Sequence, residues 1–209
     1  MVERIDSSIT RPAGVITWRA GCGGSRTSGS GSGLRKRAGR ETETAPQTDF
    51  HTYLATGEGW LYLCGIRDGC SRRVIGWAMA DHMRADLVEQ ALEMAVAFRS
   101  ADSGKIVFHA DRGSQYTSDQ IAEYATENGL KCSVGRTGVC WDNAQQESFW
   151  ASLKVEFYYR RPWATRAEAM AAVGDWIERV YNRRRRHSAL GMLTPVQFEQ
   201  LQRQTAEAA

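Results

Sequence analysis

Short runs of apolar and aromatic residues follow one another between residues 49 and 80, and they predict three β-strands. The segment TDFHTYL is rich in Thr, Tyr and Phe, and WLYLCGI (60–66) and RRVIGWAMA (72–80) follow it. β-Branched and aromatic residues of this kind favour extended structure. Because Asp68-Gly69 is a turn signal between the second and third runs, we expect an antiparallel hairpin there.

The spacing of apolar residues becomes helical after residue 85. They recur three, four and seven positions apart, which is the repeat of one face of an amphipathic helix. These residues are Leu87, Val88, Ala91, Met94, Ala95 and Phe98. The segment therefore predicts a helix of about three to four turns.

Two further strands and a helix are predicted between residues 105 and 134. KIVFH (105–109) is a continuous apolar run, as in a central strand covered on both faces, and LKCSV (130–134) is a second short run. Between these two strands, Thr117 and Gln120 can form a capping box at the start of a helix, and Gly129 is typical of the end of such a helix.

Three helices are predicted in the last third of the chain. The first begins near Asp142, the second follows the capping pair Thr165 and Glu168, and the third begins at Thr194-Pro195. The order of elements before them is three strands, helix, strand, helix, strand. The fold class is therefore α/β, with a mixed five-stranded sheet flanked by helices and additional C-terminal helices.

Residues 1–47 differ in composition from the rest of the chain. GCGGSRTSGSGSGLRKRAGRETETAP is dominated by Gly, Ser, Thr and Arg, and such a segment buries too little surface to offset the entropy of ordering. We therefore expect a disordered arm at 1–47, a folded core at 48–160, a helical extension with a basic run at 161–202, and a tail at 203–209. Contact of the basic arm with DNA is left open by its charge.

Composition narrows the class of protein. Apolar residues make up 42% of the 209 residues, and 27 Lys and Arg against 24 Asp and Glu give a weakly basic balance, as in a globular domain. Five cysteines without a CxxC pair argue against a zinc site or a disulfide framework. Since no apolar run approaches the roughly twenty residues of a membrane span and no signal-peptide core is present, we expect a soluble, cytoplasmic protein.

Two acidic residues, Asp111 and Glu147, lie in polar, glycine-containing segments with thirty-five positions (112–146) between them. Asp111 follows the buried run KIVFH, and strand ends in α/β sheets commonly hold ligands. Glu147 lies about 200° around its helix from Phe149, so it points away from the packed face. Asp49 would enter the same cleft if the first and fourth strands are neighbours.

Three carboxylates this close would repel one another unless a cation compensates their charge. Hard oxygen ligands with open positions suit Mg²⁺ or Mn²⁺, and two such ions about 4 Å apart can promote phosphodiester displacement. Solvent-facing acids without a ligand are the alternative. The run from Arg183 to Arg186, followed by His187, indicates either contact with a polyanion or a solvated helix end.

Seven segments between Asp49 and Glu199 carry a resemblance to a known family. They are GEGWLYL, SRRVIGW, FHADRGSQYTS, GVCWDNAQQESFW, SLKVE, YNRRRRHSALG and LTPVQFE. In these segments the chain resembles the integrase-like core of bacterial insertion-sequence transposases of the OrfB type, which are related to retroviral integrases. The resemblance implies a ribonuclease-H-like fold and a D,D(35)E triad for DNA strand cleavage and 3′-hydroxyl strand transfer. By position the triad is Asp49, Asp111 and Glu147, holding two Mg²⁺ or Mn²⁺ ions.

The resemblance also implies DNA as the partner, both element ends and target, and a homo-multimer acting on DNA in the bacterial nucleoid. We expect DNA contacts from the loop after Asp111, from the Glu147 helix and from the basic run. These residues are Ser114, Gln115, Asn143, Lys154, Arg183, Arg184, Arg185 and Arg186. Packing of their loop is the alternative for Ser114 and Gln115, and Asn143 can instead brace the loop before its helix.

The sequence departs from the family pattern before and after Asp49. Pro46 stands where the family usually has Trp, and the pattern Asp-x-Thr-Tyr has one extra residue here, between Asp49 and Thr52. An insertion of one residue in a strand either forms a bulge or turns one flank over. The upstream segment does not resemble the helix-turn-helix region of the family, as expected of a truncated or frameshifted copy.

Two other functions remain open on the sequence. The chain can be a non-catalytic, DNA-binding remnant of a transposase, or a ribonuclease that acts on RNA–DNA hybrids. The segments after Glu147 favour the transposase over the ribonuclease. Asp68 is a rival for the first acid of the triad, but its place in a hairpin suits a turn residue better.

Overall fold

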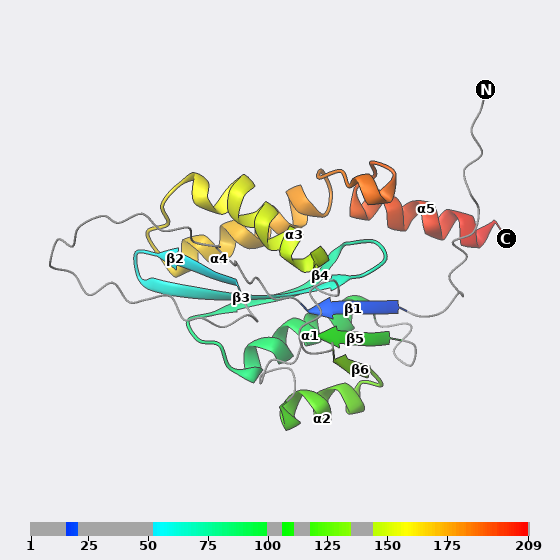
Figure 1. The fold of residues 1–209 in the computed structure, drawn as a ribbon, viewed down its shortest axis with the longest axis horizontal. Helices are drawn as coiled ribbons and strands as arrows, with labels where there is room; N and C mark the ends of the chain where they lie inside the picture. Colours follow the sequence, from blue (N-terminus) through cyan, green and yellow to red (C-terminus); the bar gives the residue numbers. More distant parts are fainter. Residues whose placement is uncertain (1–15, 21–51, 100–105, 111–117, 135–143, 209) are drawn as a thin grey trace, which may run out of the picture.

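The computed structural model describes residues 16–20, 52–99, 106–110, 118–134 and 144–208. These ranges contain a sheet of six strands with helices on both faces (Figure 1). The strands are β1 (Ile16–Ala20), β2 (Thr52–Thr56), β3 (Gly59–Asp68), β4 (Val74–Ala80), β5 (Ile106–Ala110) and β6 (Lys131–Val134). The α-helices are α1 (Ala85–Arg99), α2 (Asp119–Glu127), α3 (Ala144–Ser152), α4 (Arg166–Asp175) and α5 (Pro195–Glu207). Shorter π- and 3₁₀-helical elements are η3 (Leu153–Phe157), η4 (Tyr158–Arg160), η5 (Trp176–Tyr181) and η6 (Ser188–Leu190).

The sheet is mixed, which confirms the predicted α/β class. β3 pairs antiparallel with β4 along one edge, and with β2 and β1 end to end along the other edge. β1 also pairs with β5, and β5 with β6, both in parallel. The predicted number of five strands is wrong, because β1 adds a sixth.

β1 comes from the arm that we expected to be disordered. Its sequence, ITWRA, is rich in the β-branched and aromatic residues that suit a strand. By pairing with β3 and β5 it satisfies backbone groups that would otherwise form open sheet edges. The prediction for residues 1–47 is therefore wrong at residues 16–20, and the rest of that arm lies outside the described residues.

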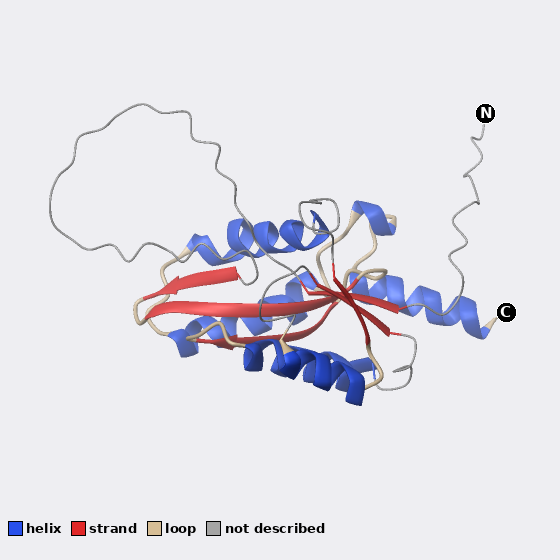
Figure 2. Cartoon of the chain, turned by 60° about the horizontal axis from the view of Figure 1, so that its bottom comes forward, coloured by secondary structure: helices blue, strands red, loops and turns tan. Residues whose placement is uncertain are grey.

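Helices lie on both faces of the sheet (Figure 2), and each face has its own hydrophobic cluster. α1 and α2 cover one face, and Gly76 of β4 allows α1 to approach because a Cβ there would lie 2.2 Å from the carbonyl oxygen of Ala91. The other face is covered by α3, α4 and η5, with a core rich in aromatic side chains. Side chains from both sides of residue 160 share this second cluster.

The predicted helix starts agree with the structure for the two C-terminal α-helices. Thr165 caps α4 by accepting a hydrogen bond from the backbone N–H of Glu168, and Thr194 forms a capping box with Gln197 at the start of α5. α2 is capped by Ser118, one residue later than predicted. None of the helices in the described ranges is long and apolar enough to cross a membrane.

Candidate active site

The C-terminal ends of β1 and β5 lie side by side next to the first turn of α3. The two strands run parallel and pair from Ile16 and Ile106 to Arg19 and His109, one residue before the end of each. Ala20, at the end of β1, pairs with Ile66 of β3. Gln146, in the first turn of α3, donates a hydrogen bond from Nε2 to the carbonyl oxygen of the adjacent Gly65 at 3.3 Å. Three segments that are distant in sequence, β1, β5 and the start of α3, thus converge at the end of the sheet where β1 and β5 terminate.

Glu147 extends from the first turn of α3 into solvent. The residues around it on the helix, Gln146 and Phe149, are buried, and Trp150 packs so closely on β3 that a Cβ on Gly65 would lie 3.1 Å from its ring. The predicted orientation of Glu147, away from the packed face, is confirmed by its exposure. No residue in the described ranges forms a hydrogen bond or ion pair with this carboxylate, which leaves it accessible to a ligand.

Five of the predicted site residues lie outside the described residues. They are Asp49, Asp111, Ser114, Gln115 and Asn143. Asp111 comes directly after the last residue of β5, and Asp49 precedes the first residue of β2 by three positions. Within the described ranges no three His, Cys, Asp or Glu side chains are grouped so that they could hold a metal ion.

Two separate strands, β2 and β1, pair with successive parts of the same edge of β3. β2 begins at Thr52, opposite Leu63, and β1 ends at Ala20, opposite Ile66. These two positions on β3 are three residues apart, or about 10 Å. If β2 continued backwards in register, residue 49 would lie opposite Ile66, but Ala20 occupies that position. The described neighbour of β5 is therefore β1, whereas the cleft that we considered for Asp49 and Asp111 requires the strand that begins near Asp49 to be that neighbour.

Lys154 lies in η3, on the π-helical continuation of the Glu147 helix. Its Nζ is 4.9 Å from the centroid of the Tyr53 ring, a cation–π contact with β2. Burial lowers the pKa of Lys154. The Lys154 side chain therefore extends from the helix to β2 and remains partly accessible to solvent.

The basic run contains arginines in two kinds of environment. Two of them form ion pairs within the fold, and these are Arg183–Glu178 at 2.7 Å and Arg185–Glu156 at 3.0 Å. The other two, Arg184 and Arg186, are exposed and form no ion pair with a described residue. Contact with DNA stays a prediction for all four, and the exposed pair is better placed for it.

The residues just before the basic run fasten η5 to the sheet. Asn182 is fully buried, and its Oδ1 accepts a hydrogen bond from Val74 N at 3.0 Å while its Nδ2 donates one to Val74 O at 2.9 Å. The amide thus satisfies both backbone groups of a residue in the edge strand β4. Tyr181 packs edge-on against Phe149 of α3, with ring centroids 4.8 Å apart.

Asp68 is a turn residue, as we interpreted it from the sequence. Its Oδ1 accepts hydrogen bonds from the backbone N–H groups of Cys70 and Ser71 at 2.9 and 2.8 Å, which closes the turn between β3 and β4. Its other oxygen pairs with Arg99 at the end of α1. Asp68 is almost fully buried and fully engaged, so it is not available to a metal ion.

A network of buried charges joins this turn to α5, and we call it the hairpin clasp. Its members are Asp68, Ser71, Arg73, Arg99 and Glu199. Glu199 pairs with Arg73 at 2.8 Å and with Arg99, and it accepts a hydrogen bond from Ser71 Oγ. Burial alone would raise the pKa of Glu199, but the bonds from Arg99, Arg73 and Ser71 outweigh it and hold the pKa below its ordinary value.

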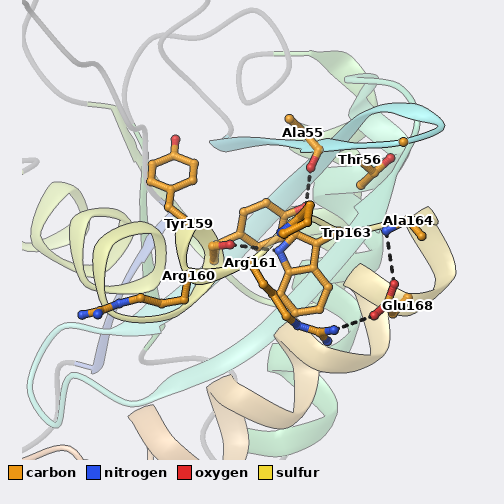
Figure 3. Close-up of a pocket in the computed structure, with 11 residues that line it drawn as sticks. Ala55, Thr56, Tyr159, Arg160, Arg161, Trp163, Ala164 and Glu168 are labelled. Atoms are coloured by element: carbon orange, nitrogen blue, oxygen red, sulfur yellow. Dashed lines mark hydrogen bonds and ion pairs between the residues drawn. The ribbon is translucent and has the colours of Figure 1, made fainter.

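The segment after η3 borders a pocket that the sequence patterns did not indicate. The pocket has a volume of about 890 Å³ and lies between the β2–β3 hairpin and residues 158–164 (Figure 3). Trp163 is buried at its base, and its Nε1 donates a hydrogen bond to Tyr158 O at 2.9 Å. The adjacent aromatic and basic residues of YYRRPW are the signal that could have indicated this site.

Two family models, both described as integrase core domains, match this sequence. One covers residues 43–140 and the other residues 128–195, so together they span 153 of the 209 residues. The sequence is 45% identical over 148 residues to the transposase InsF of insertion sequence IS3A from Escherichia coli strain K12, covering 71% of this chain and 51% of the relative. It is 41% identical over 155 residues to an uncharacterized 31 kDa protein of insertion element IS600 from Shigella sonnei, covering 74% and 57%. The chain thus spans about half the length of these relatives.

Solved structures of integrases have the same fold. The HTLV-2 integrase catalytic core domain, in a dimeric form with magnesium, matches 88% of this chain and 96% of its own with a TM-score of 0.57. The simian T-cell lymphotropic virus intasome matches 87% of this chain and 53% of its own with a TM-score of 0.59. Sequence identity is 13% in both, so these matches establish a ribonuclease-H-like fold and nothing beyond it.

Proposed function

We propose that this chain, which belongs to the integrase core family, acts as an insertion-sequence transposase that cleaves DNA strands and joins a 3′-hydroxyl end to target DNA. The observation that carries the proposal is Glu147, an exposed carboxylate without a protein partner in the described ranges, at the edge where β1 and β5 end. Its neighbours Gln146 and Phe149 are buried and fix the turn that presents it.

We further propose Asp49 and Asp111 as the other two acids of the site. Asp111 follows β5 directly, so its Cα lies about 3.8 Å from that of the last residue of the strand. Asp49 is three residues from Thr52, so the chain allows at most about 11 Å between their Cα atoms. Both distances support a site at the same edge of the sheet as Glu147.

The residues proposed fit Mg²⁺ or Mn²⁺, because all three offer hard carboxylate oxygens and Glu147 has no competing partner among the described residues. When bound, such ions would polarise the phosphodiester and help to deprotonate the attacking hydroxyl. The chain itself would hold the ions with the three acids, and Lys154 with the exposed Arg184 and Arg186 would neutralise phosphates beside them. Ser114, Gln115 and Asn143 would complete the contacts to DNA.

The proposal is tested by metal-dependent nicking and joining of labelled oligonucleotides. We expect Glu147→Gln to reduce the rate by more than the roughly 10- to 100-fold that loss of an outer-shell partner of a metal costs. Glu123→Gln is the matched control, since Glu123 is an exposed carboxylate on α2, outside the proposed site. Unchanged joining in both Glu147→Gln and Asp111→Asn would show that these acids are not the metal ligands.

A DNA-binding protein without catalysis is the second candidate, and the arrangement of β1 favours it. Ala20 occupies the ladder position that residue 49 would take in an uninterrupted first strand. This candidate predicts salt-sensitive DNA binding with no nicking. Calorimetric titration with Mn²⁺ separates the two: binding of Mn²⁺ that is lost in Glu147→Gln supports the enzyme, and no measurable heat supports the binding protein.

A further inference from the structure

The helix that carries Glu147 continues into an exposed strip that ends beside the pocket. Val155 and Tyr159 are each 63% exposed, on the π-helical and 3₁₀-helical turns that continue α3. Arg160 follows and is also exposed. We call Lys154, Val155, Tyr159 and Arg160 the η4 ridge. Large apolar side chains gathered at the surface in this way commonly mark a binding site.

The charges around the ridge are predominantly positive. Two arginines and one carboxylate line the pocket, and Lys154 contacts Tyr53 of β2, the strand whose last residues also line the pocket. Glu168 is engaged by Arg161 at 2.8 Å, and the Arg161 guanidinium lies 4.0 Å above the Trp163 ring. The Arg160 Nε donates to the carbonyl oxygen of Val155 at 3.1 Å, which orients a guanidinium that remains exposed.

Tyr159 and Arg160 project away from the side chains that close the base of the pocket. Figure 3 shows both extending from the turn on the side opposite Glu168, whereas Arg161 crosses the Trp163 ring to reach Glu168. Burial and the neighbouring Tyr53 raise the pKa of Tyr159, so its hydroxyl is neutral at physiological pH. The ridge therefore presents an uncharged aromatic ring beside a cation.

The distance from Glu147 relates the ridge to DNA. Tyr159 follows Glu147 by twelve residues, which corresponds to roughly 15–18 Å along the helical segment. Successive phosphates of one strand are about 3.4 Å apart along the axis. A strand that passes Glu147 and follows the helix would reach Tyr159 about five nucleotides later.

We propose that the η4 ridge binds an unpaired nucleotide of the DNA, about five nucleotides from the reacting phosphate. The base stacks on Tyr159, Arg160 and Lys154 contact the flanking phosphates, and the pocket is large enough to hold a nucleotide. An unpaired nucleotide is required because stacking on a side chain needs a free base face. The positive charge favours nucleic acid over a peptide as the occupant. The choice of DNA rests on the proposed function, but the binding itself does not depend on catalysis.

The test compares two labelled DNA probes by fluorescence anisotropy with the full chain. One is a blunt duplex, and the other is the same duplex with a single-stranded flank. We expect tighter binding of the flanked probe, and Tyr159→Ser to weaken it about five-fold or more with little change for the blunt probe. Tyr159→Phe should bind like the wild type because it keeps the ring. Arg160→Ser should reduce the salt slope by about 0.7, whereas Arg160→Lys keeps it.

Leu201→Ser is the control, because Leu201 is 52% exposed on α5, at the opposite end of the molecule (Figure 1). Equal binding of both probes by the wild type would overturn the proposal for the ridge while leaving the proposed function standing. The same holds if Tyr159→Ser binds the flanked probe like the wild type, or if Tyr159→Phe loses as much as Tyr159→Ser. Failure of the wild type to bind either probe would instead overturn the proposed function.

Discussion

The hairpin clasp, where the β3–β4 turn meets α5, and the η4 ridge lie in different parts of the molecule (Figure 1), and the environments of their charged side chains are opposite. In the clasp, Glu199 is 5% exposed and its oxygens are engaged by two arginines and a serine. On the ridge, Arg160 is exposed, and its one described hydrogen bond goes to a backbone carbonyl. Guanidinium groups are therefore paired with a buried carboxylate in the clasp, whereas the guanidinium on the ridge is exposed to solvent.

This difference separates stability from binding. A buried carboxylate whose partners are all supplied by the chain cannot take a ligand without breaking those bonds, and removal of one partner leaves a buried charge uncompensated. An exposed guanidinium contributes little to folding but can meet a phosphate at small cost. We therefore expect changes in the clasp to alter the free energy of unfolding, and changes on the open surface to alter DNA binding.

The largest effect on stability is expected for Glu199→Ala. Loss of this carboxylate leaves Arg73 and Arg99 buried without their common partner, which should lower the free energy of unfolding by about 3–5 kcal/mol. Denaturant unfolding measures it. Arg203→Ala is the control. The Arg203 side chain is exposed, and its distance of 4.0 Å from Glu199 is at the limit for an ion pair, so its loss should cost little. A loss below about 1 kcal/mol in Glu199→Ala would contradict the role assigned to the clasp.

A somewhat smaller loss is expected for Asn182→Ala. This change leaves the N–H and C=O groups of Val74 without their amide partners in the interior, at a cost of about 2–3 kcal/mol. Asn128→Ala, which removes one half-buried bond to Tyr124 O, should cost less than 1 kcal/mol by the same measurement. Equal losses in the two variants would mean that Asn182 does not fasten η5 to β4.

The outcome for these residues shows what the sequence could predict. The apolar spacing predicted the helices and five strands well, and the exposure of Glu147 followed from its angle to Phe149. The hairpin position of Asp68 also predicted its role in the turn. All three depend on local patterns. The clasp could not be predicted, since Ser71 and Glu199 are 128 positions apart and meet only in the folded chain.

The strand β1 escaped prediction for a different reason. Its five residues have strand propensity. The longer segment that contains them is rich in Gly and Ser, and the composition of that segment predicts disorder. What stabilises the strand is the pair of neighbours on either side, β3 and β5, and these are supplied by tertiary structure. Strand formation that depends on such neighbours is not encoded locally.

Acid should destabilise the fold through His187, which directly follows the basic run and is half-buried. Burial, with Arg185, Arg72 and Arg67, lowers its pKa to about 4. The folded chain therefore keeps His187 neutral while the unfolded chain takes up a proton below about pH 6.5. This difference in pKa corresponds to at most about 3 kcal/mol, and solvent around the half-buried ring screens part of it, so stability should fall by about 1–2 kcal/mol as the pH drops from 6.5 to 4, and then level off. His187→Phe keeps a ring against Tyr181 and should flatten this part of the pH profile; an unchanged slope would exclude His187 as the cause.

The smallest effects are expected in the basic run. Arg184→Ser and Arg186→Ser should each reduce the salt slope of duplex binding by about 0.9 and leave stability within about 0.5 kcal/mol. Arg183→Ser is the matched variant, because its ion pair with Glu178 should make it matter less for binding. Anisotropy titrations at several salt concentrations measure all three slopes. Three equal reductions would show that the ion pair opens when DNA binds.

The position of β1 in the sheet has a consequence for the order of folding. The β2–β3 hairpin closes over two residues, whereas Ala20 meets Ile66 across 46 positions. Since each doubling of a loop costs about 0.6 kcal/mol in chain entropy, β1 docks with a handicap of about 2–3 kcal/mol. Since β5 and β6 meet the other described strands only through β1, these three strands should join the sheet after the β2–β3–β4 meander. The edge beneath Glu147 is then complete only while β1 is docked, so local unfolding of five residues would control how often the site is assembled.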